Sequence, residues 1–246
     1  MRITLHEAEI IVKHAKIIFG ENTEVILFGS RTDDTQKGGD IDLYIEPQSH
    51  FNLMEKKLEY LSLLEKQLGE QKIDVVFKKD STHPIDKQVS LKGIKLDIAT
   101  LKLKTYFNQC HKHIQRIDEA YDDMKHIIPL SVEKYKNLNK DEVQDIDQYI
   151  FRFSKLQDTM GDKIFKMILT QYEGHETHIP FMDLLNKLEK FGCISSAKEW
   201  SYLRKLRNEI SHQYDDEPEE MTQAINALLS QKEIIKNIFT QLENCI

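Results

Sequence analysis

The sequence predicts an α+β domain over residues 1–100, with a small mixed sheet flanked by helices, followed by an all-α helical bundle over residues 101–246. Strand-like segments, which alternate apolar and polar residues or form short β-branched runs, occur only in the first hundred residues. After about Asp97, apolar residues recur at three- and four-residue spacing, which is typical of packed helices. These two patterns indicate two domains of different class.

The composition is that of a globular protein. The 246 residues are 30% charged and 40% hydrophobic, which excludes a collagenous or low-complexity chain. No apolar run approaches the ~18 residues of a membrane span, and the N-terminus lacks the apolar core of a signal peptide, so we expect a cytoplasmic protein with no membrane partner. The net charge of −7 argues against nonspecific nucleic-acid binding through a basic surface. The widely separated Cys110, Cys193 and Cys245 predict no disulfide framework, and we expect them to be reduced.

The first three elements of the α+β part can be placed from their periodicity. Residues 5–19 have an amphipathic helical pattern that ends at Gly20. Residues 24–28 form a short apolar run with β-branched side chains, which predicts a strand. Residues 41–45 alternate apolar and polar side chains strictly and stop at Pro47, which predicts a second strand.

The remaining elements of this part follow the same rules. Residues 51–68 repeat apolar side chains at helical spacing and stop at Gly69. Residues 72–77 are a third strand candidate, and a short helix is expected over 84–91 because a proline opens it.

The bundle is expected to contain long helices separated by Gly and Pro. The breaks fall at Pro129, at Gly174 with Pro180, at Gly192 and at Pro218. The expected helices cover 97–127, 142–171, 180–191, 196–213 and 219–243.

A Gly-Ser turn and a pair of aspartates suggest a site for a metal-bound nucleotide. Asp40 and Asp42 are two residues apart at the start of a strand, so their side chains share one face. Two carboxylates at such a short separation repel each other unless a cation lies between them. Hard oxygen ligands of this kind favour Mg²⁺. Gly29 lets a backbone N–H approach a phosphate closely, and the Ser30 hydroxyl and N–H can donate to phosphate oxygens.

A third aspartate extends this site. If the strand that carries Asp74 pairs beside the strand of Asp42, the carboxylates form a set able to hold two ions and to accept a proton from an attacking hydroxyl. The nearby Arg31 and Lys37 are candidates for contact with the triphosphate, although solvated loop charges are the alternative.

These residues resemble the polymerase-β-like nucleotidyltransferase superfamily, especially its minimal (MNT) members, over roughly residues 1–100. Gly29, Ser30, Asp40 and Asp42 match its Gly-Ser and Asp-x-Asp motifs, and Asp74 matches its third carboxylate. The resemblance implies Mg²⁺-dependent transfer of a nucleoside monophosphate, here AMP from ATP, to a hydroxyl with release of pyrophosphate.

A second group of functional candidates lies near the end of the helix expected over 196–213. Arg207 and His212 suit RNA cleavage, because His exchanges a proton near neutral pH and Arg stabilises charge on phosphate. At ~100° per residue the two side chains are separated by about 140° around a helix. They therefore need distortion of the helix end or a second chain to meet, which favours a homodimer through the helical part.

This segment resembles the Arg-x-x-x-x-His-x-Tyr motif of HEPN toxins. Arg207, Asn208, His212 and Tyr214 fall on its positions, and the helical half resembles the HEPN bundle. The chain is thus similar to a fused HEPN/MNT toxin-antitoxin pair, in which the MNT protein silences a dimeric RNase by AMPylation of the motif tyrosine. The resemblance implies RNA as a partner and Tyr214 as the acceptor.

Two alternatives remain open. Kanamycin nucleotidyltransferase also joins a catalytic α/β domain to a helical bundle, and the acidic balance of the helical half suits a cationic small-molecule acceptor. That resemblance leaves Arg207, His212 and Tyr214 unexplained. In the other alternative, the helical half is a binding module without catalytic activity.

Overall fold

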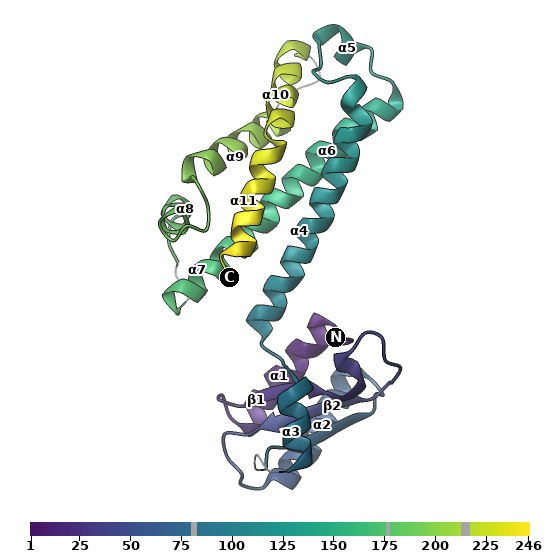
Figure 1. Ribbon diagram of the computed structural model, residues 1–246, viewed down its shortest axis with the longest axis vertical. Coiled ribbons are helices and arrows are strands. Elements are labelled where there is room, and N and C mark those ends of the chain that lie inside the picture. The colour runs from purple at the N-terminus through teal and green to yellow at the C-terminus, as the bar shows by residue number, and fades with distance from the viewer. Residues whose placement is uncertain (80–82, 176–177, 213–216) are drawn as a thin grey trace. The chain divides into compact units, whose positions relative to one another are not determined.

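The computed structural model describes residues 1–79, 83–175, 178–212 and 217–246, the side chains of 211 and 212 excepted (Figure 1). The chain divides into two compact units, Met1–Lys102 and Leu103–Ile246. The first combines a small sheet with helices and the second is helical, in agreement with the predicted fold classes. The described residues contain no helix that is both long and apolar enough to cross a membrane.

The first unit is built on a mixed sheet with the strand order β3-β2-β1-β4. β2 pairs with β1 in antiparallel and with β3 in parallel orientation, and β1 also pairs with the two-residue β4. The predicted strands are all present, whereas β4 is too short to produce a periodic pattern. The strands are β1 (Glu24–Phe28), β2 (Ile41–Glu46), β3 (Ile73–Phe77) and β4 (Ile94–Lys95).

One face of the sheet packs against α1 (Leu5–Phe19) and α2 (Leu53–Leu68). Leu43 is fully buried in this core, and the Tyr60 hydroxyl from α2 donates to the Ile11 carbonyl at 2.8 Å. Removing such a side chain from water stabilises a fold by about 1.5–3 kcal/mol. This apolar core therefore fixes which residues of each strand face inward.

The opposite face of the sheet is covered in part by α3 (Pro84–Lys92). Phe28, Tyr44 and Val89 form a small apolar cluster there. The Tyr44 hydroxyl donates to the buried carboxylate of Asp86 and so joins β2 to α3.

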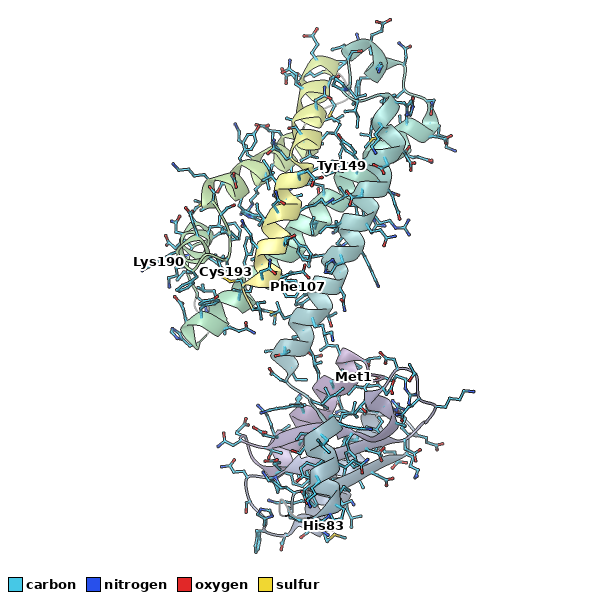
Figure 2. The ribbon with its side chains drawn as sticks, in the orientation of Figure 1. Met1, His83, Phe107, Tyr149, Lys190 and Cys193 are labelled. Atoms are coloured by element: carbon cyan, nitrogen blue, oxygen red, sulfur yellow. A yellow bond between two sulfur atoms is a disulfide. The ribbon has the colours of Figure 1, made fainter. Side chains whose placement is uncertain are left out.

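The second unit is a helical assembly around one core (Figure 1). Figure 2 labels Phe107 of α4, whose ring meets the Phe239 ring of α11 edge to face with centroids 5.8 Å apart. Short 3₁₀ turns cover Gly29–Thr32 in the first unit and Met124–His126 in the second. The helices from the unit boundary onward are α4 (Ile98–Asp123), α5 (Val132–Lys136), α6 (Lys140–Thr159), α7 (Phe165–Glu173), α8 (Phe181–Lys190), α9 (Ala197–His212), α10 (Pro218–Ser230) and α11 (Lys232–Asn244).

Two long helices expected from the sequence differ in detail. The helix expected over 142–171 is interrupted by a π-helical segment, Met160–Ile164, where Gly161 lies against the Trp200 ring. The helix expected over 219–243 is two helices, because Gln231 leaves the helical conformation at ψ 4°. Both breaks are short compared with the windows over which periodicity is read, so periodicity alone did not indicate them.

The expectation that all three cysteines are reduced is wrong for two of them. Cys193, which Figure 2 labels, forms a disulfide with Cys245 across a sequence separation of 52. Cys110 is free and buried. The sequence spacing gave no sign of this pair, because tertiary packing brings the end of α11 to the connection between α8 and α9.

We expect Leu43→Ala to lower the free energy of unfolding by about 2–5 kcal/mol, because it leaves a cavity in the sheet core. Leu91→Ala is the matched control: the same atoms are removed from a residue that is 84% exposed, and the change should stay within about 0.5 kcal/mol. Urea unfolding of the full chain measures both. Equal losses in the two variants would contradict the placement of Leu43 in the core.

Candidate functional site

Two aspartates face each other on neighbouring strands of the first unit. Asp42 of β2 and Asp74 of β3 are register partners in the parallel pair. Side chains of register partners project from the same face of a sheet. The pairing of β3 beside β2, on which the role predicted for Asp74 depends, is therefore present.

The Gly-Ser turn lies directly against this pair. Phe28, the last residue of β1, is the register partner of Asp42, and Gly29 follows it with φ 73°. A Cβ placed on Gly29 would overlap the Oδ2 atom of Asp42. Only glycine fits here, because both the backbone conformation and the space exclude a side chain.

The loop between the turn and β2 is held by Arg2. Its guanidinium donates to three backbone carbonyls: those of Ser30 at 2.9 Å, Gly38 at 2.9 Å and Asp33 at 3.2 Å. Ser30 also packs closely on Gly38, where a Cβ would overlap its Oγ atom. The sequence analysis missed Arg2, since an isolated arginine near the N-terminus carries no motif.

The two predicted triphosphate contacts have different surroundings. The Arg31 guanidinium donates to the Gly39 carbonyl at 2.5 Å and to the Arg2 carbonyl at 3.2 Å, so it helps to close the same loop. Lys37 is exposed on that loop. Contact of either residue with a triphosphate stays a prediction.

Lys72 is a charged neighbour of the aspartates that the sequence analysis did not single out. Its Nζ atom lies 2.5 Å from Asp40 Oδ2 and 3.7 Å from Asp74 Oδ2. These carboxylates raise the pKa of Lys72, mainly through the hydrogen bond to Asp40. The available signal was its position two residues before Asp74, which places both side chains on one face of a strand.

The electrostatics of the aspartates favour a cation. Burial raises the pKa of Asp42, the charges of Asp74 and Asp40 raise it further, and the charge of Lys72 lowers it. Ionisation of Asp42 is thus disfavoured by lost hydration and by like charge. A divalent cation would relieve both, and Mg²⁺ is typically held by one or two carboxylates together with substrate phosphates. Asp42 and Asp74 fit that requirement.

The shared metal-binding role of Asp40, Asp42 and Asp74 stays a prediction. Within the part of the chain that the structure describes, no three or more His, Cys, Asp or Glu side chains are grouped closely enough to hold a metal ion. The Asp40 carboxylate is paired with Lys72 in this structure.

The second predicted site is described only in part. Arg207 lies on α9, and its Nη1 atom is 3.2 Å from Asp158 Oδ1 on α6. The side chain of His212 and the whole of Tyr214 lie outside the described residues. Their proximity to Arg207 stays a prediction.

Comparison with protein families supports the first unit's assignment. Residues 9–120 match the model of the nucleotidyltransferase domain family, a range that includes the sheet, the Gly29-Ser30 turn and the three aspartates. This supports the nucleotidyltransferase part of the resemblance and nucleotidyl transfer as the class of activity. Neither a search of curated proteins nor a search of solved structures gives a match.

We expect Gly29→Ala to destabilise the protein more than Gly69→Ala. Both glycines have positive φ, but nothing lies within 4 Å of a Cβ on Gly69. The control should therefore cost only the conformational penalty of about 1–3 kcal/mol, whereas the Gly29 variant should lose about 1–3 kcal/mol more from overpacking against Asp42. Urea unfolding measures the difference, and equal losses would contradict the close approach.

Proposed function

We propose that this chain transfers AMP from Mg²⁺-bound ATP to a hydroxyl group, with the chemistry in residues 1–102. The observation that carries the proposal is the register pairing of Asp42 with Asp74 directly beside the Gly29 turn. In a segment that matches a nucleotidyltransferase domain, this arrangement supports a cation site next to the turn, where the backbone N–H groups of Gly29 and Ser30 are the candidate donors to phosphates.

Each residue of the site has a distinct task in this proposal. Asp42 and Asp74 hold the cation, and Asp40 joins them when Lys72 releases it. Gly29 and Ser30 bind triphosphate oxygens through N–H and hydroxyl donors. Mg²⁺ bound there supplies positive charge that stabilises the phosphates and the departing pyrophosphate.

The transfer is an in-line displacement at phosphorus. The acceptor oxygen forms a bond to the α-phosphorus, while the bond from that phosphorus to the bridging oxygen breaks. Pyrophosphate leaves with the electron pair of that bond. The hydroxyl proton passes to a carboxylate, for which Asp74 is the candidate because it is more exposed than Asp42.

We expect Asp42→Asn to reduce Mg²⁺-dependent pyrophosphate release from ATP by about a hundredfold or more, because it removes the charge nearest the turn. Glu70→Gln is the matched control, since it removes an exposed carboxylate between α2 and β3, and it should leave the rate unchanged. Wild-type turnover in the Asp42→Asn variant would contradict the proposal.

The proposed acceptor is the hydroxyl of Tyr214, in the same chain or in its dimer partner. The support is the HEPN-like placement of Arg207, His212 and Tyr214 in the sequence. A tether raises the effective concentration of the acceptor around the modifying domain. AMP on Tyr214 would add negative charge beside an RNase site formed by Arg207 and His212, and so silence it by repelling RNA phosphate.

We expect intact-mass and peptide analysis to find one AMP moiety on Tyr214 after incubation with ATP and Mg²⁺. The adduct should be absent in Tyr214→Phe and in Asp42→Asn. Tyr202→Phe is the matched control, since Tyr202 is 47% exposed on α9, the helix that carries Arg207, and it should keep the adduct. Transfer of label to an aminoglycoside, with none to the protein, would contradict this acceptor and favour a small-molecule substrate.

A further inference from the structure

One cation of the first unit lies among the carboxylates of the proposed site. Lys72 comes directly before β3, and its carbonyl accepts a hydrogen bond from the Ile41 N–H at 2.9 Å, so the parallel pairing of β2 and β3 extends to it. In this register Lys72 is the cross-strand neighbour of Asp40, and Asp42 with Asp74 is the pair two positions further along. An oppositely charged pair is thus followed on the same face by a pair of like charge.

The position of the ammonium connects the two pairs. Its Nζ atom contacts Asp40 Oδ2 at 2.5 Å and lies 3.7 Å from Asp74 Oδ2, the more distant of the two carboxylates. The Lys72 ammonium therefore lies near both Asp40 and Asp74, where a metal ion that bound both carboxylates would also have to lie. The two kinds of cation are competitors for the same oxygens.

We propose that Lys72 is a tethered counter-ion that couples metal binding to nucleotide binding. In the nucleotide-free protein its ammonium neutralises Asp40 and weakens divalent-cation binding. When triphosphate binds with the metal, the ammonium leaves Asp40 and pairs with phosphate oxygens. This inference rests on the proposed nucleotidyl transfer and adds a regulation of that site.

The exchange is physically accessible. The Lys72 side chain is 67% exposed and the Asp40 side chain is 44% exposed, so the ammonium can move without disturbing the core. Exposed ion pairs contribute little to stability, and a doubly charged ion interacts more strongly with a carboxylate than an ammonium does. The triphosphate then supplies the displaced ammonium with a new anionic partner.

Reciprocity follows from this coupling. If nucleotide raises the affinity for the metal by some factor, the metal raises the affinity for nucleotide by the same factor. With this coupling, the protein binds the metal ion or the nucleotide weakly when either is alone, and it binds both tightly when they are present together. Lys72 thus has two partners in this proposal: the Asp40 carboxylate in the free protein and the substrate phosphates in the complex.

The test measures Mn²⁺ binding to the full chain by electron paramagnetic resonance, with and without a non-hydrolysable ATP analogue. We expect Lys72→Gln to bind Mn²⁺ alone about three- to tenfold more tightly than wild type, because a competing charge is removed. The factor by which the analogue tightens Mn²⁺ binding should fall by a similar amount. Lys72→Arg, which keeps the charge, should retain most of the coupling.

Lys78→Gln is the matched control. Lys78 pairs with Glu46 at 2.7 Å at the other end of the same two strands, so its loss removes a comparable exposed ion pair away from the aspartates. It should leave Mn²⁺ affinity and coupling unchanged. Circular dichroism melting curves establish that each variant is folded.

Two outcomes separate this inference from the proposed function. If wild type binds Mn²⁺ with the analogue, Asp42→Asn does not, and Lys72→Gln behaves like wild type, the counter-ion role is overturned while nucleotidyl transfer stands. If wild type binds no Mn²⁺ even with the analogue, both are overturned. Tighter binding in Lys72→Gln together with reduced coupling supports the inference.

Discussion

The candidate site depends on the register of the parallel pair β2 and β3. That register places Asp42 opposite Asp74, an arrangement that like charges disfavour, so something else must enforce it. The next residues along the two strands enforce this register. Leu43 and Val75 are also register partners, and they are buried in the apolar core. A slip of one residue would turn these side chains to solvent and bring the carboxylates into the core. Apolar burial on one face thus holds two negative charges together on the other.

The turn and loop beside the aspartates are held by a different kind of interaction. Arg2 and Arg31 donate to backbone carbonyls of the loop before β2, and few apolar side chains pack there. Hydrogen bonds at an exposed surface can be replaced by hydrogen bonds to water at a small free-energy cost, whereas opening a packed core costs much more. The carboxylates therefore lie on a packed strand pair, while the segment proposed to bind the phosphates can adjust. Gly29 joins the two regions, since it lies so close to Asp42 that a Cβ on it would overlap the carboxylate.

The sequence predicted the parts of this site that depend on local pattern. The strands of Asp42 and Asp74 follow from alternation, and the Gly29-Ser30 turn follows from the residues that end β1. Lys72 and Arg2 were missed because their contacts arise from strand register and loop closure, which no single segment displays. The disulfide of Cys193 with Cys245, the π-helical segment at Gly161 and the two-residue β4 were missed for the same reason. The assignments for His212 and Tyr214 stay predictions.

Asp42 shows why such a site favours a bound cation. The pKa of Asp42 is raised in the folded protein, so folding disfavours its ionised form. The resulting loss of stability is fully present at pH values above the raised pKa, and it is absent at pH values below the pKa of Asp42 in the unfolded chain. At neutral pH the folded chain therefore carries an electrostatic cost that its own residues relieve only in part. Lys72 reduces it from one side, and its contacts go to Asp40 and Asp74, not to Asp42. A cation bound at the proposed site would release the remaining cost at Asp42, and that release would add to the affinity for the cation.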